Sequence, residues 1–161
     1  MNLENEKIPI IIKAIFVIAL LAYIISICLA DSSKDIPMDT ISTTMTKKAD
    51  LDGLDQCGKS ELARFYGLQE KNLDGYFFYK APSPMSVDEV LIVKSSSKED
   101  AATVLEAMQT RLDSQKNVFD GYGTDQIALL NDAFVASKGD YSYYMCGKNA
   151  AKWRELFLSL I

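Results

Sequence analysis

The chain contains an uninterrupted apolar run at residues 14–30, AIFVIALLAYIISICLA, which carries no charged side chain. Crossing the hydrocarbon core of a bilayer takes about 20 residues of helix. The run itself has 17 residues. Residues 8–12 extend it past the required length when the ammonium group of Lys13 reaches towards the interface. The sequence therefore favours a retained transmembrane helix.

Two other kinds of leader stay open. A cleaved signal peptide has a shorter apolar region of roughly 7–15 residues, with small residues before the cleavage site. The tripeptide CLA at residues 28–30 is a weak version of such a site. Lipid attachment at Cys28 usually requires a small residue directly before the cysteine, and this chain has Ile27 there. A buried helix of a soluble protein is disfavoured because few globular helices are apolar on every face.

All three leaders place the rest of the chain outside the cytoplasm. Lys7 and Lys13 are positive charges that favour the cytoplasmic side of the membrane. Glu4 and Glu6 hardly offset them, because acidic residues contribute little to this rule. We therefore expect a single-pass protein of the cell membrane, which contacts the membrane through its N-terminal segment and holds its main domain outside the cytoplasm.

Three parts are expected along the chain: a membrane anchor or signal segment at residues 1–30, a linker at 31–37 and an extracytoplasmic domain at 38–161. About 130 residues remain after the leader, which is enough for one compact domain and too few for two. The formal net charge is −5 and the lysines are scattered. Nucleic-acid binding requires clustered lysine and arginine, so no nucleic-acid partner is expected.

The residue periodicity after residue 37 predicts an α+β domain. Helices are expected at residues 38–51, at 59–66, from 97 to a point before the glycines at 121 and 123, and from 149 onwards. Strands are expected at residues 76–80, 90–94, 133–137 and 141–146. The sequence KGD at 138–140 is typical of a tight hairpin turn. Hairpin-connected strands imply an antiparallel sheet of about four strands, with amphipathic helices covering one face.

Several segments of the chain resemble an uncharacterised family. They are YGL at 66–68, VDEVLIVK at 87–94, RLDSQKNVFDGYG from Arg111, and NDAFVASKGDY up to Tyr141. The family is domain of unknown function 4358, which comprises small domains of Gram-positive bacteria, often behind a signal or lipoprotein leader. The resemblance covers about residues 38–160. It implies no activity, cofactor or site residue. The chain departs from the lipoprotein members in lacking a good lipid-attachment box.

Two cysteines, Cys57 and Cys146, fall in the expected extracytoplasmic domain. An oxidising compartment permits a disulfide between them, which would join the beginning of the domain to its last strand. The other interpretation is a pair of unpaired, buried small side chains. Neither cysteine belongs to a C-x-x-C pattern, so no dithiol redox site is predicted.

The familiar catalytic and metal-binding patterns are missing or incomplete. The chain has no histidine, which removes the usual base of serine and cysteine hydrolases. The three aspartates of ADLDGLD at residues 49–55 lack the full loop of a calcium-binding hand. Ser95 and Lys98 match S-x-x-K, but the companion motifs of penicillin-recognising enzymes are absent. The sequence predicts no catalytic residue, no metal and no cofactor.

Carboxylate pairs remain as candidates for acid–base chemistry. Asp88 with Glu89, and Glu99 with Asp100, sit where solvated faces and helix N-termini favour acidic groups. No pair is therefore singled out. A carboxylate-dependent hydrolase of the cell envelope stays the alternative function, and whether the protein is an enzyme is left open with a non-enzymatic role favoured.

Tyrosines of the predicted strands are the remaining candidates for a binding surface, namely Tyr76, Tyr79, Tyr141 and Tyr143. Alternation along a strand sends half of each set to the opposite face of the sheet. Outward tyrosines form an amphipathic surface of the kind that recognises peptides, glycans or another protein. The competing interpretation is ordinary strand-forming tyrosines with their hydroxyls in water. We expect a binding or envelope-assembly module whose partner is an envelope protein, a peptide or a glycan.

Overall fold

The computed structural model describes residues 13, 15–23 and 33–161. The chain divides into two compact units, residues 1–32 and 33–161. Residues 15–23 of the apolar run are helical. The remainder of the run, with the cleavage and lipid-attachment positions near Cys28, lies outside the described residues. Within the described ranges, no helix has both the length and the apolar character needed to cross a bilayer.

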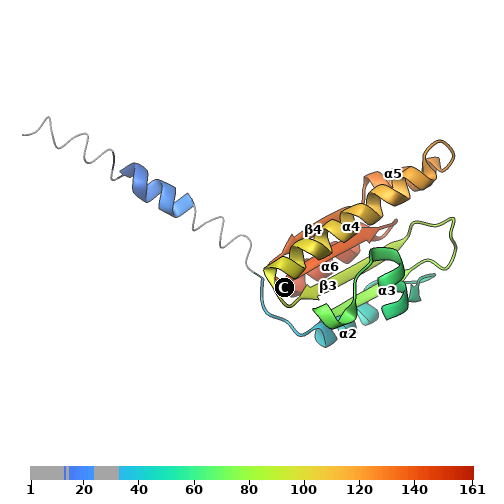
Figure 1. The fold of residues 1–161 in the computed structure, drawn as a ribbon, viewed down its shortest axis with the longest axis horizontal. Helices are drawn as coiled ribbons and strands as arrows, with labels where there is room; N and C mark the ends of the chain where they lie inside the picture. Colours follow the sequence, from blue (N-terminus) through green and yellow to red (C-terminus); the bar gives the residue numbers. More distant parts are fainter. Residues whose placement is uncertain (1–12, 14, 24–32) are drawn as a thin grey trace, which may run out of the picture. The chain divides into compact units, whose positions relative to one another are not determined.

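The second unit is an α+β domain built on a five-stranded antiparallel sheet (Figure 1). Its strand order is β1-β2-β3-β5-β4. The strands are β1 (Asp55–Gln56), β2 (Leu73–Lys80), β3 (Glu89–Ser95), β4 (Phe134–Lys138) and β5 (Tyr141–Cys146). The α+β class and the four expected strands are confirmed. β1 is an addition, because two exposed polar residues carry no strand periodicity.

Five α-helices and one short 3₁₀ helix accompany the sheet in this unit. They are α2 (Met38–Lys48), α3 (Lys59–Tyr66), η1 (Glu70–Asn72), α4 (Lys98–Phe119), α5 (Thr124–Asn131) and α6 (Ala150–Leu160). α4 begins where the sequence predicts, since the Ser97 hydroxyl accepts a hydrogen bond from the Asp100 N–H at 3.1 Å. α5 was not expected. Only Leu130 of its residues is buried, which leaves no amphipathic pattern to detect.

Helices cover both faces of the sheet, whereas the sequence predicted one covered face. One core lies between the sheet and α2 with α6, and includes Ile41, Met45, Ile92, Trp153 and Phe157. The other lies between the sheet and α3, α4 and α5, and includes Leu62, Leu91, Met108 and Tyr144. In the central strand β3 every residue except Lys94 is buried. Such a continuous run is the pattern of a strand that is buried on both sides.

Candidate functional site

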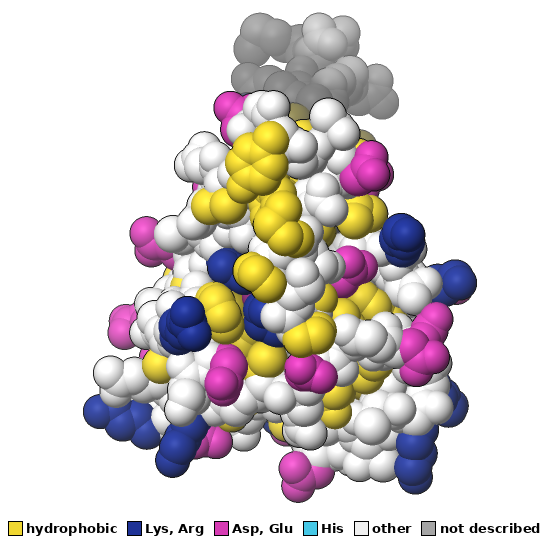
Figure 2. All heavy atoms as spheres, turned by 90° about the vertical axis from the view of Figure 1, so that its right-hand side faces the viewer, with side chains coloured by type: hydrophobic (Ala, Val, Ile, Leu, Met, Phe, Trp, Pro, Cys, Tyr) yellow, Lys and Arg dark blue, Asp and Glu magenta, His cyan; other side chains and the backbone are white. Residues whose placement is uncertain are grey.

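A pocket of about 530 Å³ opens between α3, α4 and the connection from β2 to β3. This volume lies in the range of ligand sites in proteins. Figure 2 looks onto the end of the domain that carries this connection, and shows basic side chains set among hydrophobic ones in the middle of the face. The lining mixes both kinds, and includes Arg64, Phe65, Lys80, Pro82, Arg111 and Phe119.

Three cations surround one aromatic ring in the pocket wall. The guanidinium carbon of Arg111 lies 4.7 Å from the centroid of the Phe65 ring, Lys80 Nζ lies 5.1 Å from it, and the guanidinium carbon of Arg64 lies 5.3 Å from it. The ring quadrupole attracts all three charges. Lys80 also donates a hydrogen bond to the Ala81 carbonyl oxygen at 2.7 Å. The basic groups are therefore positioned by the protein before any ligand arrives.

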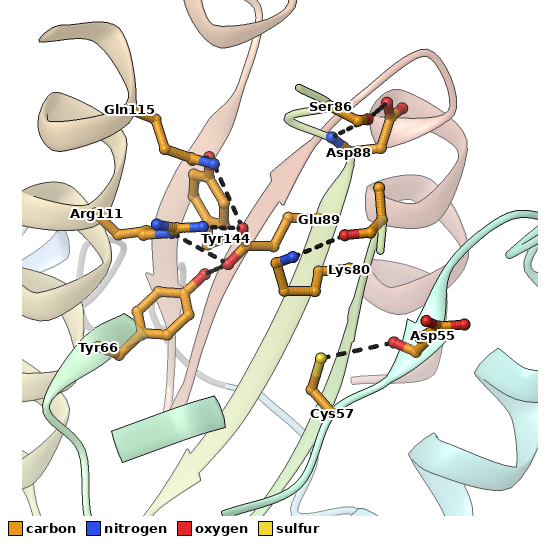
Figure 3. A network of polar contacts seen from close by, with 11 residues as sticks. Asp55, Cys57, Tyr66, Lys80, Ser86, Asp88, Glu89, Arg111, Gln115 and Tyr144 are labelled. Atoms are coloured by element: carbon orange, nitrogen blue, oxygen red, sulfur yellow. Dashed lines mark hydrogen bonds and ion pairs between the residues drawn. The ribbon is translucent and has the colours of Figure 1, made fainter. Parts of the chain in front are cut away.

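A buried carboxylate, Glu89, lies behind this wall (Figure 3). Its exposure is 1%. Arg111 Nη2 donates to Glu89 Oε2 at 2.8 Å, and Arg111 Nε contacts Oε1 at 3.4 Å. The Tyr66 hydroxyl donates to Oε1 at 2.5 Å, and Gln115 Nε2 lies 3.5 Å from Oε2. The Tyr144 hydroxyl donates to Gln115 Oε1. Both carboxylate oxygens therefore accept hydrogen bonds.

Four elements bring this network together. Glu89 begins β3, Tyr66 ends α3 and Tyr144 lies on β5. Arg111 and Gln115 are four residues apart in α4, so they project from the same side of that helix. The Tyr66 ring also packs edge-on against Tyr144, with ring centroids 6.3 Å apart. The expectation that Glu89 sits on a solvated face is wrong. Arg111 and Gln115, which lie 22 and 26 positions further along the chain, cover its side chain.

The two tyrosines and Arg111 of the network have raised pKa values. Burial raises the pKa of Tyr66 well above its ordinary value, and the Glu89 charge raises it further. Burial also raises the pKa of the Tyr144 hydroxyl. Burial alone would lower the pKa of Arg111. The Glu89 carboxylate more than offsets this effect, so the pKa of Arg111 is raised. Both tyrosines therefore act as hydrogen-bond donors at neutral pH, and Arg111 stays positively charged.

The two cysteines are free and buried. Cys57 follows β1 and Cys146 ends β5, and strands β2 and β3 lie between them. At about 4.8 Å per strand spacing, three spacings make roughly 14 Å, whereas a disulfide needs Cα atoms within about 7 Å. Of the two interpretations, the structure therefore has the unpaired, buried cysteines, and their thiols lie near the carbonyl oxygens of Asp55 and Leu129, at 3.6 and 3.5 Å.

The four tyrosines suggested as a binding surface do not form one. Tyr141 is 1% exposed and Tyr143 is 3% exposed, and both pack edge-on against Phe157 of α6. Tyr79 is partly buried in the same core, and Tyr76 is partly buried on the opposite face. The reason is the second helical layer, which covers the face that would otherwise present the tyrosines.

The remaining sequence motifs have structural partners. In ADLDGLD, the Asp50 side chain accepts a hydrogen bond from Asn149 Nδ2 at 3.1 Å, and its carbonyl oxygen accepts one from Trp153 Nε1 at 2.8 Å. The segment therefore ties the loop after α2 to α6. Of S-x-x-K, Ser95 is buried at the end of β3 and Lys98 begins α4. In the described part of the chain, no group of three or more His, Cys, Asp or Glu is placed to hold a metal ion.

Comparison with known proteins gives one match. The model of a family described as Domain of unknown function (DUF4358) matches residues 47–147, which is more than half of the chain. No curated protein and no solved structure matches. The matched region runs from the end of α2 through β5. It contains the pocket and every member of the polar network, while α6 lies outside it.

The buried pair predicts an unequal response to single and double substitution. Arg111→Met leaves the Glu89 carboxylate buried without its cation, and we expect this to lower the free energy of unfolding by about 3–5 kcal/mol. The double variant Glu89→Leu with Arg111→Met removes both charges. The double variant should lose less free energy of unfolding than the two single variants lose in sum, and the difference should be about 1–3 kcal/mol. Urea unfolding of the full chain measures all three values.

The exposed ion pair of Lys94 with Asp35 provides the control for this cycle, because the Asp35 side chain is 82% exposed. Asp35→Ala should change the free energy of unfolding by no more than about 1 kcal/mol. Strict additivity of the single variants, or an Arg111→Met cost as small as that of Asp35→Ala, would contradict the structural role given to the buried pair.

The two thiols should react slowly in the folded protein. Burial raises the pKa of Cys57 to about 11 and of Cys146 to about 12. Because the thiolate is the reactive form, modification of Cys57 by a disulfide reagent at pH 8 should be about 100-fold slower than that of an ordinary thiol. Its rate should rise about tenfold per pH unit from pH 8 to 10. The stabilisation that these neutral thiols give to the folded state is complete at a pH below the thiol pKa of the unfolded chain. It is lost as the pH rises through the thiol pKa of the folded protein.

A Cys28→Ser background leaves only these two thiols to count. In denaturant both should react at once, which gives two equivalents per chain. Zero equivalents in denaturant would reveal a disulfide. Rapid reaction of the folded protein at pH 8 would show that the thiols are not buried as described.

Proposed function

The chain belongs to the DUF4358 family of domains of unknown function, and we propose that it is a membrane-tethered, extracytoplasmic binding protein. Its ligand occupies the pocket between α3, α4 and the β2–β3 connection. The ligand is a peptide segment that presents a carboxylate to the basic groups of the pocket. The observation that carries this proposal is the fixed Arg111 in the pocket wall, held by a buried carboxylate behind it.

One guanidinium nitrogen of Arg111, Nη1, is available to bind a ligand. Arg111 Nε and Nη2 contact Glu89, and Nη1 has no hydrogen-bond partner among the described residues. A guanidinium binds a carboxylate through short, charge-assisted hydrogen bonds. Because the Arg111 side chain is already immobilised, ordering it costs a ligand little conformational entropy. Lys80 lines the same pocket and adds a second cation for the same group.

The other walls suit a peptide better than a glycan. Val118 and the Pro82 and Pro84 of the β2–β3 connection give apolar surface for a side chain. The aromatic rings in the lining are Phe65, which is surrounded by cations, and Phe119, which is 3% exposed. Neither ring offers the open face that an aromatic binding platform needs. Peptide binding is therefore the better supported of the two.

The hydrolase alternative receives no comparable support. A general base must reach the proton that it abstracts, but Glu89 is buried and accepts hydrogen bonds on both oxygens. Glu61, which lines the pocket, accepts a hydrogen bond from the Gly58 N–H at 3.0 Å and so closes the first turn of α3. These two carboxylates have structural roles.

The membrane tether rests on the N-terminal segment. Lys7 and Lys13 precede an uncharged apolar run. Within the described residues 15–23, the helix exposes Ile15, Phe16, Val17, Ile18, Leu20 and Leu21 by 49–70% each. A helix that is apolar on all sides requires apolar surroundings. A bilayer around this segment supplies them.

Binding to the pocket should depend on a free carboxylate. The full chain in detergent is used to select short binding peptides from a library whose members have free C-termini. Amidation of the C-terminus should lower the affinity of a selected peptide by about tenfold or more. Lys80→Met should weaken binding of the free-acid peptide by about tenfold and leave the amidated peptide unaffected. Lys152→Met, an exposed substitution on α6, is the control and should change neither. Equal binding of the acid and the amide would overturn the proposal.

In the proposed orientation the folded domain lies outside the cytoplasm. Protease added to intact cells that express the full chain should degrade residues 33–161, while a cytoplasmic protein in the same cells survives. The N-terminal fragment should stay with the membrane fraction after carbonate washing. Protection of the domain in intact cells, with degradation only after lysis, would contradict the orientation.

A further inference from the structure

The outer edge of β2 is open along most of its length. β1 pairs with Tyr79 and Lys80 and the Cys57 N–H bonds to Phe78, so residues 73–77 have no neighbouring strand on that side within the described chain. An edge strand of this kind presents unpaired main-chain groups that another strand can use. The short β1 therefore leaves a vacant strand position beside β2.

Main-chain N–H and C=O groups of β2 point towards this vacant strand position. The Cys57 N–H donates to the Phe78 carbonyl oxygen at 2.9 Å, so the main chain of Phe78 faces the β1 side. Main-chain groups alternate in direction along an antiparallel strand. The N–H and C=O of Tyr76 therefore point to the same open side, where no described strand meets them.

A groove of about 560 Å³ follows this edge. It is lined by residues 74–79 of β2, by four residues of α2, by residues 56–58 at the end of β1 and after it, and by Glu70 of η1. α2 comes close to the strand, since a Cβ added to Gly75 would lie 2.8 Å from the Met38 side chain. The groove is therefore bounded by folded elements and has the open strand edge along it.

The lining of the groove carries charge of one sign. Asp39, Glu70 and Asp74 are acidic, and no lysine or arginine is among the described residues that line it. Within the described chain, none of these three residues forms an ion pair. A second copy of the same edge would bring like charges together, which disfavours self-association here. Charge complementarity selects a basic segment.

We propose that an extended, basic peptide segment of another protein adds to the open edge of β2 as a further strand. Its main chain pairs with Tyr76, and its lysine or arginine side chains face the acidic lining of the groove. Main-chain hydrogen bonds supply affinity in this mode of recognition, and alternate side chains supply specificity. The inference does not rest on the function proposed for the pocket, because it uses a different surface.

A peptide of alternating lysine and valine, seven residues long with blocked ends, is the probe. Hydrogen exchange on the full chain in detergent should show that residues 74–78 exchange at least tenfold more slowly when the peptide is bound. The Tyr76 amide in particular should gain protection. Residues 134–138 of β4, at the other edge of the sheet, serve as the internal reference and should not change.

Two comparisons separate strand addition from simple charge attraction. The same peptide with alternate backbone amides methylated keeps its charge but cannot pair, and it should not protect β2. Asp39→Asn with Glu70→Gln should weaken binding of the unmethylated peptide by roughly 3- to 10-fold. Asp125→Asn is the matched control, since Asp125 is another acidic residue in the first turn of a helix, and it should have no effect.

Three results would overturn the proposal: equal binding of the methylated peptide, protection of β4 instead of β2, and slow exchange of β2 caused by self-association without peptide. Lys80→Met should leave this binding unchanged, because Lys80 lines the pocket and not the groove. Loss of pocket binding in that variant therefore leaves the strand-addition test intact, and the two proposals fail independently.

Discussion

The buried pair of Glu89 and Arg111 is the interaction on which the rest of the domain depends. A carboxylate with 1% exposure is costly to bury unless a cation and hydrogen bonds compensate it. Its partners come from α3 and α4, so satisfying this one charge fixes how two helices lie on the sheet. The same guanidinium forms part of the pocket wall, so the fold and the proposed binding site share this residue.

Two helical layers decide where function can lie. β3 and β5 are buried on both faces, which removes the middle of the sheet as a recognition surface. The accessible parts of the sheet include its end, where the β2–β3 connection and α4 enclose the pocket, and the edge of β2 that the short β1 leaves open. Cys57 lines both sites, and they differ in charge: three basic groups together with Asp55 and Glu61 line the first, whereas the charged groups that line the second are all acidic.

Features set by neighbouring residues were predictable from the sequence. The Ser97 cap, the hairpin turn at Gly139 and the apolar run of β3 are local signals, and each predicts the element that forms. The site was not predictable, because the partners of Glu89 lie 22 to 26 residues away and only the tertiary fold brings them together. The separation of Cys57 from Cys146 depends likewise on strand order, and the burial of Tyr143 on a helix that follows it.

The most direct measurement is a crystal structure of the protein with a carboxylate-bearing peptide bound. We expect the carboxylate to accept hydrogen bonds from Arg111 Nη1 and Lys80, while the contacts of Arg111 with Glu89 stay as they are in the free protein. A peptide seated elsewhere would contradict the assignment of the pocket. An Arg111 side chain that leaves Glu89 to reach the peptide would contradict the central claim that the buried pair holds the site ready for its ligand.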